Sequence, residues 1–449
     1  MTAPGGKATR IVSPARRAAF AILRRVEEDD AYAVPLLAAA DSGIRADDRA
    51  LCYELVLGTL RWQLWLDALI EHYAGRAAAS LDPPVRRALR LGLYQLRFLS
   101  RIPASAAVND SVNLAHISKM RSAAAFINAV LRRAVREPEI DPAAEIRDPI
   151  HRLEIETSHP GWLLERWIAA FGRREAEEFA RSNNHAPPVA FRVTASGKAE
   201  EILNALRAQG GELETSRLIP DAWRIRGASA RMHQLAGEAK IYVQDEASQL
   251  VAHVLGARAG DRVLDVCAAP GSKTTHIAAL APGLALLVAG EVHENRARIL
   301  AEAATGGNAD QFNVVIHDAE AGLPYTNALF DRVLVDAPCS GTGTLRRNPE
   351  IRWRISEEDI FDLSARQQRI LIASAQMVKR GGRLVYSTCS VETEENERVV
   401  ESFLRETPDF RPAPLNLPHG PRDDAATVRT WPQQEGTDGF FIASFERSS

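Results

Sequence analysis

Two kinds of hydrophobic pattern divide the chain. Up to about residue 140, apolar side chains recur every three or four residues, the spacing of one face of an α-helix. Beyond about residue 260, short apolar runs alternate with helix-like stretches, which is typical of parallel strands joined by helices. The region between carries both patterns. The sequence therefore predicts three domains, at residues 1–140, 150–240 and 241–449.

The first domain is predicted to be an all-α bundle. Ser13 and Pro14 suit the start of a helix, because proline has no N–H to lose in the first turn. Apolar residues at 19, 22, 23 and 26 then follow at helical spacing. Further helices are expected at 48–60, 64–73, 84–99, 106–118 and 123–135. Arginines cluster at 86–87, 90, 97, 101 and 132–133, either on a solvated helix face or at an RNA contact.

The middle region is predicted to be a small α+β subdomain that handles RNA. Helices are expected at 159–171 and 200–209, and strands at 189–193 and 223–226. Its tryptophans, Trp162, Trp167 and Trp223, are more typical of a core than of stacking platforms. A helix over 242–255 then leads into the third domain.

The third domain is predicted to be a doubly wound α/β sheet. Strands are expected at 262–267, 285–291, 312–318, 330–336 and 382–387. Helices are expected at 295–304, 359–378 and 393–405. Two further strands, 428–431 and 439–445, are separated by turn residues and predict an antiparallel hairpin at the sheet edge.

The first strand of this sheet ends in a turn of small residues. Pro270-Gly271 follows the strand, and Ser272-Lys273 opens a helix whose free N–H groups can face a ligand. The turn lacks the Gly-x-Gly-x-x-Gly pattern, and Cys267 stands where a P-loop has its first glycine. By itself the turn fits an ordinary βα connection equally well.

Acidic residues follow the strands at the edge where such sheets bind ligands. Asp265, Glu291, Asp318 and Asp336 lie at or near four successive strand ends. Each one alone is explained as a helix cap or a loop charge. Together they indicate a nucleoside ligand, with Glu291 placed to accept hydrogen bonds from ribose hydroxyls.

Two of the four cysteines lie at the same edge. Cys339 follows the fourth strand and Cys389 the fifth, so neighbouring strands would bring both sulfurs to one cleft. A lone cysteine is usually a buried small hydrophobe, but two beside a carboxylate point to thiol chemistry. With Cys52 and Cys267 they show no Cys-x-x-Cys spacing, so we expect neither disulfides nor a metal site.

Composition and charge fit a cytoplasmic globular protein. The 449 residues are 46% hydrophobic and 25% charged, with no apolar run long enough for a bilayer and no signal-peptide core. The net charge of −3 is unevenly distributed. Residues 1–140 hold 20 Lys and Arg against 14 Asp and Glu, a balance of +6 that suggests an RNA-facing part.

Residues 1–140 resemble the helical domain of the antitermination factor NusB. The matching stretches begin with Arg16-Arg17-Ala-Ala-Phe and include 55–60, 91–96 and 126–132. This resemblance implies RNA binding by the first domain.

The third domain strongly resembles the Sun (Fmu) family of RNA cytosine-C5 methyltransferases. The matching motifs are residues 265–274, 336–343 and 387–390. Their order, with the NusB-like domain in front, is similar to the bacterial 16S ribosomal RNA enzymes of that family. The resemblance implies a Rossmann-like class I methyltransferase sheet. Two positions differ from the usual pattern: Ser272 replaces glycine and would cap the next helix, and Glu291 replaces aspartate.

The resemblance also implies a role for each candidate site residue. Cys389 would attack C6 of cytosine as a thiolate, Cys339 would aid release, and Asp336 would bind the cytosine edge or the cofactor. The cofactor would be S-adenosylmethionine, its methionine end held by Cys267, Ala268, Ala269, Pro270, Gly271, Ser272 and Lys273. Glu291 would bind its ribose and Asp318 its adenine. No metal is needed.

The segment 345–354, directly after the Cys339 motif, is the remaining basic feature. Arginines around Trp353 suit phosphates and base stacking, although a surface loop with one packed tryptophan explains them equally well. We expect a monomer that acts on ribosomal RNA, without a membrane or DNA partner. Two alternatives stay open: a DNA cytosine-C5 methyltransferase, in which the Pro-Cys thiol attacks, and a non-catalytic RNA-binding assembly factor.

Overall fold

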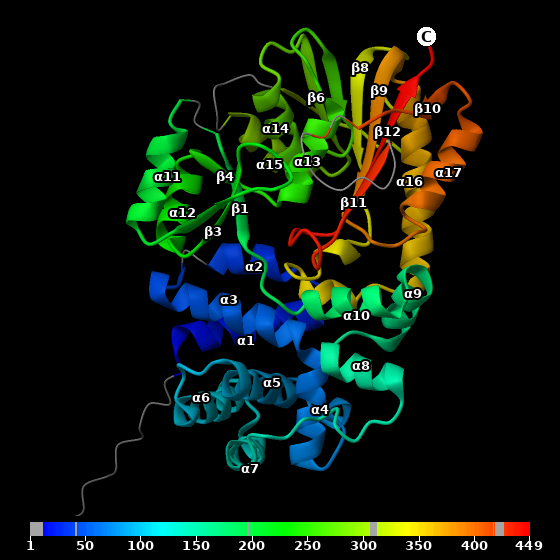
Figure 1. Cartoon of the computed structure of the whole chain (residues 1–449). Helices are drawn as coiled ribbons and strands as arrows, with labels where there is room; N and C mark the ends of the chain where they lie inside the picture. Colours follow the sequence, from blue (N-terminus) through cyan, green and yellow to red (C-terminus); the bar gives the residue numbers. More distant parts are fainter. Residues whose placement is uncertain (1–11, 41–42, 195–196, 306–311, 416, 418–425) are drawn as a thin grey trace, which may run out of the picture. The chain divides into compact units, whose positions relative to one another are not determined.

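The computed structural model describes residues 12–40, 43–194, 197–305, 312–415, 417 and 426–449. The chain divides into two compact units (Figure 1). The first comprises residues up to His185 together with Leu345–Arg354, and the second comprises Ala186–Thr344 and Ile355–Ser449.

The first unit is helical, which confirms the predicted all-α fold for the described residues up to 140; the helices from 149 to 182 belong to the same unit. Its helices are α1 (Pro14–Glu28), α2 (Ala33–Ala40), α3 (Ala46–Arg61), α4 (Gln63–Ala74), α5 (Pro83–Phe98), α6 (Ala104–Ile117), α7 (Ala124–Arg136), α8 (Pro149–Thr157), α9 (Gly161–Phe171) and α10 (Arg173–Ser182). In α1 the apolar positions form one buried face that includes Ala19, Ile22 and Leu23, as the periodicity requires. The short helix α2 was not predicted from the pattern. It buries only Ala33 and Leu37, too few positions to show a helical period.

Some arginines of the bundle lie in ion pairs inside the first unit. Arg87 is 2% exposed, and its guanidinium contacts Glu27 at 2.6 Å and Glu28 at 2.9 Å. Arg90 makes two hydrogen bonds to Asp67, at 2.7 and 2.6 Å. The prediction that the clustered arginines either face solvent or contact RNA is therefore wrong for Arg87 and Arg90. Sequence periodicity shows that a charge lies off the apolar face, but not that a carboxylate from another helix meets it.

The segment Leu345–Arg354 is packed among the helices of the first unit. Arg352 is 1% exposed and donates from Nη1 to the Ser158 oxygen at 3.0 Å. Trp353 donates its indole N–H to the Leu60 oxygen at 2.8 Å. Of the two alternatives for this segment, the structure favours the packed tryptophan, and Arg352 is buried instead of lying at the surface.

The second unit begins with a four-stranded antiparallel sheet. Its strands are β1 (Val189–Val193), β2 (Glu212–Thr215), β3 (Ala222–Arg226) and β4 (Ile241–Val243), in the order β2–β3–β1–β4. Helices α11 (Ala199–Ala208) and α12 (Ser229–Gly237) supply its core. The expected helix 242–255 is wrong at its start. Helix α13 (Glu246–Leu255) begins after Asp245, whose carboxylate accepts the Ala247 N–H at 2.9 Å.

A larger mixed sheet follows in the described part of the second unit. Its strands are β5 (Arg262–Asp265), β6 (Leu286–Glu291), β7 (Asn313–Ile316), β8 (Phe330–Asp336), β9 (Val378–Thr388), β10 (Phe410–Pro412), β11 (Thr427–Thr430) and β12 (Phe440–Arg447). The order is β10–β12–β9–β8–β5–β6–β7, with β11 also paired to β12. Strands β5 to β9 are parallel, and β12 is antiparallel to β9. This confirms the predicted Rossmann-like sheet with an antiparallel edge.

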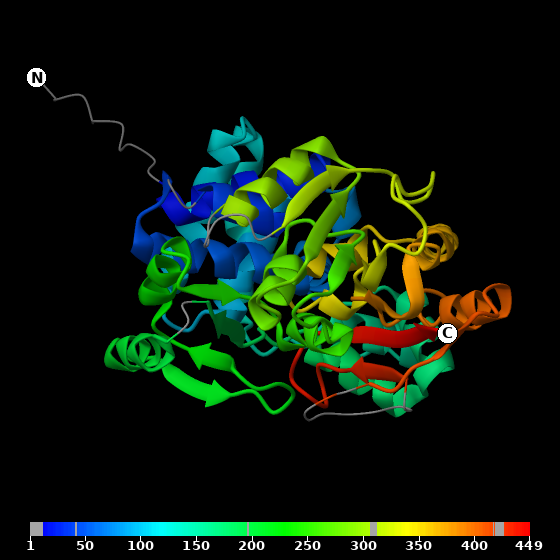
Figure 2. The ribbon, with the colours of Figure 1, turned by 90° about the horizontal axis from the view of Figure 1, so that it is seen from above.

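Successive side chains of the central strands point to opposite faces of the sheet and pack into two separate cores. Val263, Leu334 and Val385 pack on one face, in the cluster that includes α13, α14 (Ser272–Leu280) and α15 (Glu294–Thr305). Leu264 and Val333 pack on the other face with α16 (Glu357–Ala375) and α17 (Glu397–Glu406). Figures 1 and 2 show α16 and α17 side by side next to the sheet. Helices on both faces leave the strand ends free to carry chemistry.

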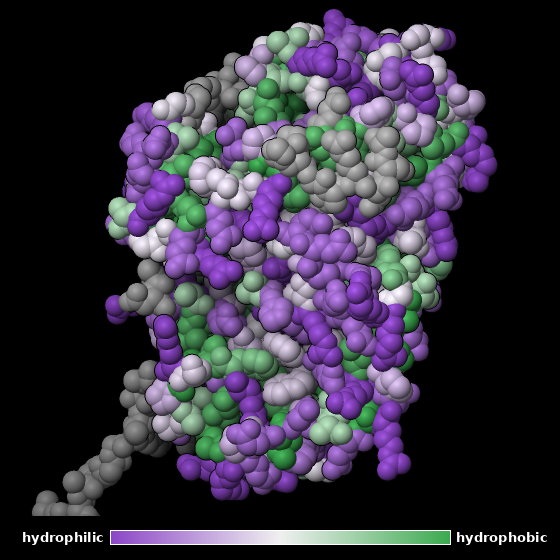
Figure 3. Space-filling view, viewed as in Figure 1, coloured by the Kyte–Doolittle hydropathy of each residue, from purple (hydrophilic) through white to green (hydrophobic). Residues whose placement is uncertain are grey.

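Hydrophobic side chains are scattered among hydrophilic ones on the face drawn in Figure 3. The large apolar side chains lie mainly in the cores of the two units, including Trp167 in the first and Phe330 in the second. Among the described residues, no helix is both long and apolar enough to cross a membrane.

Candidate active site

The carboxyl ends of neighbouring parallel strands surround a cavity of about 320 Å³ in the second unit. Strand β5 lies between β6 and β8, and β9 follows β8, so the segments after these strands meet at one edge of the sheet. The residues that line the cavity include Cys267, Glu291, Asp318, Asp336, Cys339 and Cys389. The structure therefore brings together, around one cavity, candidates that lie up to 122 residues apart in the sequence.

Two residues of the small-residue turn line the cavity directly. Cys267 and Ala269 line the cavity, whereas the other members of 267–273 are not among its lining residues. Gly271 has a φ of +104°, and a Cβ there would meet the Leu300 side chain at 3.0 Å, so the turn requires glycine. The expected cap by Ser272 is wrong. Ser272 is the first residue of α14, and no side chain caps that helix end.

The two rim cysteines are in direct contact. Their Sγ atoms lie 3.3 Å apart, and both residues are free thiols. Strands β8 and β9 pair Asp336 with Ser387, so each cysteine comes from the segment that follows one of these strands. The Gly343 N–H also donates to the Cys389 oxygen at 2.9 Å, which ties the two segments together.

The environment favours the protonated form of Cys339. Its pKa is raised well above the ordinary value, first by the hydrogen bond with Cys389, then by burial and by the negative charge of Glu395. Burial similarly raises the pKa of Cys267, with Asp265 adding to the effect. Cys339 therefore keeps its proton and stays a neutral thiol at neutral pH.

A buried lysine holds Asp336 at the base of the cavity. Lys273 Nζ lies 2.7 Å from Asp336 Oδ2, and Ser387 donates to Oδ1 at 2.8 Å. Burial alone would lower the pKa of Lys273, but the Asp336 carboxylate outweighs it and raises that pKa. Lys273 was expected at the methionine end of a cofactor. In the structure its Nζ pairs with Asp336 and lies 5.3 Å from the centre of the Phe440 ring.

Glu291 presents its carboxylate at the end of β6. It is 4% exposed and lines the cavity. Its Oε1 accepts the His293 N–H at 2.9 Å, and Oε2 lies 3.5 Å from Arg296 Nε. The next residue, Val292, is 40% exposed and lines the same cavity. A carboxylate beside an apolar side chain can bind a ribose next to a flat base.

Asp318 lies on the same wall, where several neighbours were not singled out from the sequence. Asp318 Oδ1 accepts the Glu320 N–H at 2.9 Å. The unpredicted lining residues include His293, Arg296, His317 and Arg366. His293 and Arg296 follow Glu291 within five residues, so their position after a strand end was an available signal. Burial lowers the pKa of His317, which keeps its ring neutral at this wall.

Asp265 lies behind the cavity. Its side chain has no solvent exposure and accepts the Thr274 hydroxyl at 2.6 Å. Burial raises its pKa to about 7, and the charge of Asp336 adds to that effect. Asp265 is not among the residues that line the cavity. Its hydrogen bond to Thr274 instead links the end of β5 to α14. Within the described ranges, no group of three or more His, Cys, Asp or Glu side chains could hold a metal ion.

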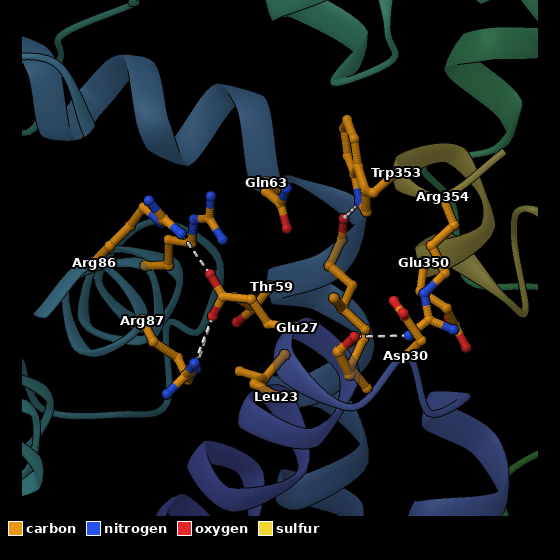
Figure 4. A pocket seen from close by; sticks show the side chains of 13 residues that line it. Leu23, Glu27, Asp30, Thr59, Gln63, Arg86, Arg87, Glu350, Trp353 and Arg354 are labelled. Carbon is orange, nitrogen blue, oxygen red and sulfur yellow. Dashed lines mark hydrogen bonds and ion pairs between the residues drawn. The ribbon is translucent and has the colours of Figure 1, made fainter. Parts of the chain in front are cut away.

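A second cavity, of about 220 Å³, lies in the first unit (Figure 4). Arg86 and Arg87 point toward Glu27 on one side, and Glu350 and Arg354 lie on the other. Arg86 contacts Glu27 at 2.6 Å, and Arg354 donates to two backbone oxygens at 2.7 Å each. Glu350 accepts a backbone N–H at 2.8 Å. Each of these charged side chains makes at least one hydrogen bond or ion pair within the first unit.

Comparison with known proteins agrees with this geometry. Residues 252–446 match the family described as 16S rRNA methyltransferase RsmB/F, residues 13–136 match the NusB family, and residues 159–230 match the RsmF/B-like ferredoxin-like domain. A probable ribosomal RNA small subunit methyltransferase B of Bacillus subtilis is 36% identical over 96% of this chain and 98% of its own. A ribosomal RNA small subunit methyltransferase B of Pseudomonas putida is 36% identical over 88% and 90%. The crystal structure of PH0851 has a TM-score of 0.82 and 29% identity, covering 97% of this chain and all of that one.

The fold and the strand-end cavity define a Rossmann-like methyltransferase with a helical NusB-like region in front. Identity to the relatives extends over nearly the whole of each chain. The protein belongs to the RsmB/F family of 16S rRNA methyltransferases.

Proposed function

We propose that the protein transfers a methyl group from S-adenosylmethionine to C5 of a cytosine in 16S ribosomal RNA, through a covalent adduct between Cys389 and C6. The observation that carries the proposal is the contact of two thiols at the ends of neighbouring strands, beside carboxylates that line one cavity. Transfer to a nitrogen or oxygen would need no such pair, because those atoms already have a lone pair for the methyl group.

The cavity fits S-adenosylmethionine by the chemistry of its walls. Glu291 would accept hydrogen bonds from the ribose hydroxyls, and Val292 would contact the adenine, with Asp318 at its edge. Cys267 and Ala269 offer short side chains where the methionine end would approach the backbone. When bound, this cofactor supplies an electrophilic methyl group.

Cys389 would make the cytosine ring reactive. Its thiolate pair forms the S–C6 bond, and the C5–C6 π pair moves to C5, which becomes nucleophilic enough to take the methyl group. Asp336 would face the cytosine edge or the cofactor, held in place by Lys273 and Ser387. A proton shared with ring N3 would favour the attack.

Cys339 would act after the methyl group has moved. Once Cys389 is bonded to carbon, it no longer carries the negative charge that raises the pKa of Cys339. Cys339 can then lose its proton more readily and remove the C5 proton as a thiolate. The C5–H pair restores the C5–C6 double bond, the S–C6 bond breaks, and Cys389 leaves as a thiolate.

The other regions would supply the RNA substrate. We propose residues 1–140 as the NusB-like RNA-binding domain, 150–240 as a subdomain that handles RNA, and 241–449 as the methyltransferase domain. The relatives' description as ribosomal RNA small subunit methyltransferases supports ribosomal RNA as the partner. We propose that the protein acts in the cytoplasm.

The experiment is methyl transfer from labelled S-adenosylmethionine to unmodified 16S rRNA, followed by nuclease digestion and mapping of the labelled nucleotide. We expect label only in 5-methylcytosine, at one or a few positions. Label in another nucleoside would refute cytosine-C5 transfer. Transfer to DNA but not to RNA would favour a DNA-type enzyme, and binding without transfer would favour an assembly factor.

A further inference from the structure

A buried glutamate lies behind the two cysteine segments and has no part in the scheme above. Glu395 lies between β9 and α17 and has no solvent exposure. Its Oε1 accepts the Ser340 N–H at 2.8 Å and the Gln367 amide at 2.9 Å. Its Oε2 accepts the hydroxyls of Ser340 and Ser390. Among the described residues no salt bridge joins Glu395 to a cation, so these donors stabilise its charge.

The two serines make this carboxylate a bridge between the cysteine segments. Ser340 directly follows Cys339, and Ser390 directly follows Cys389. Their hydroxyls also lie 3.0 Å apart. The bridge is therefore one residue away from each sulfur, while its anchor, Glu395, comes from outside both segments.

Further hydrogen bonds restrict the movement of the bridge. Thr342 lies 3.4 Å from the Ser340 hydroxyl and 3.3 Å from that of Ser390, and its own oxygen accepts the Val391 N–H at 3.1 Å. Tyr386 donates its hydroxyl to the backbone oxygen of Glu395. Each segment is thus attached to the same carboxylate by side chains that have few other orientations available.

We propose that Glu395 is a positioning residue that sets the contact between Cys339 and Cys389 through its bonds to Ser340 and Ser390. It positions the two thiols through its bonds to the serines, without a hydrogen bond to either sulfur among the described residues. This inference rests on the proposed function for its catalytic meaning, but the contact itself exists without RNA or cofactor. Its negative charge also raises the pKa of Cys339, in support of the same division of roles.

If Glu395 had only a structural role, its replacement would have a different effect. A buried carboxylate with several donors can stabilise the fold without influencing the thiols. Its replacement would then lower the melting temperature while leaving the chemistry of the cysteines in the folded protein unchanged. The decisive measurements therefore follow the thiols of the folded protein in the absence of substrate.

The test compares Glu395→Gln with the wild-type protein and with Glu394→Gln as a matched control, because Glu394 pairs with Arg398 instead. The first readout is the rate at which diamide, a dithiol oxidant, forms a Cys339–Cys389 disulfide. Two thiols become one disulfide while the diazene is reduced to a hydrazine. We expect the rate to fall by about tenfold or more in Glu395→Gln, because proximity governs intramolecular reactions.

The second readout is the pH profile of Cys339 alkylation by iodoacetamide, followed by peptide mass spectrometry. Loss of a nearby negative charge should shift the midpoint to lower pH by about one unit, which is about tenfold in rate at a fixed lower pH. Should Glu395→Gln fail to fold, Ser340→Ala and Ser390→Ala test the bridge, and each should slow disulfide formation. Unchanged disulfide and alkylation behaviour in folded variants would overturn the proposal.

Methyl transfer completes the test and separates it from the proposed function. In the folded variants we expect a lower kcat with unchanged KM for S-adenosylmethionine. A wild-type protein that transfers no methyl group to cytosine, although its thiols respond to Glu395→Gln, would refute the proposed function and leave the positioning role standing. A wild-type protein that transfers methyl groups, with variants whose thiols are unaffected, would refute only the positioning role.

Discussion

Replacing Asp265 with asparagine should remove a pH dependence of stability that follows from its burial. The carboxyl has no solvent exposure, and its Oδ1 has no hydrogen-bond partner among the described residues. Only Oδ2 accepts a side-chain donor, the Thr274 hydroxyl at 2.6 Å. Burial therefore raises the pKa of Asp265 to about 7, compared with 3.8 for an ordinary aspartate.

The sign follows from which state holds the proton. Between about pH 4 and pH 7 the folded protein keeps the Asp265 proton that the unfolded chain releases, so the free energy of unfolding falls as pH rises. Each pH unit changes this free energy by about 1.4 kcal/mol, and the three units together by about 4 kcal/mol. Asparagine binds no proton, so the wild-type protein should lose stability relative to Asp265→Asn across this range.

The assay is urea unfolding of both proteins at several pH values from about 5 to 8, followed by circular dichroism. The difference in unfolding free energy should change by about 3 kcal/mol between about pH 5 and pH 7, then level off. Asp331→Asn is the control. Although burial opposes it, the hydrogen bond from Lys379 lowers the pKa of Asp331, so its contribution stays constant above about pH 5. Parallel curves for the wild-type protein and Asp265→Asn would refute the reasoning.

The remaining predictions concern the cofactor, the cysteines and the packed segment. Glu291→Ala should weaken S-adenosylmethionine binding by about 1.5–3 kcal/mol, tenfold or more, in calorimetry; the exposed Glu294→Ala is the control, and unchanged affinity would remove Glu291 from the site. Cys389→Ala should abolish transfer and form no adduct, whereas Cys339→Ala should accumulate a covalent protein–RNA species on a denaturing gel; the opposite pattern would indicate a DNA-type mechanism. Trp353→Phe removes the bond to a backbone oxygen and should destabilise the first unit by roughly 1–3 kcal/mol in chemical unfolding, and an unchanged value would show that the bond contributes nothing.

The sequence alone determined the class of the fold and the residues that could carry chemistry. Short uninterrupted apolar runs, at 263–264 and 333–335, are typical of parallel strands that are buried on both faces. Glu291 and Asp336 could be found at the strand ends because in such sheets those ends form the ligand edge. The motif around Cys389 was recognisable because it is local in the sequence.

Tertiary structure alone decided which of these residues meet. Apolar periodicity reports which face of an element is buried but not its partner, so the order β9–β8–β5 and the 3.3 Å contact between Cys339 and Cys389 required the folded chain. Lys273 shows the same limit, because its partner Asp336 lies 63 residues away. Glu395 carried no signal, since a charged residue before a helix normally faces solvent. In the folded chain, hydrogen-bond donors from separate segments converge on its carboxylate, and this convergence makes a buried charge tolerable.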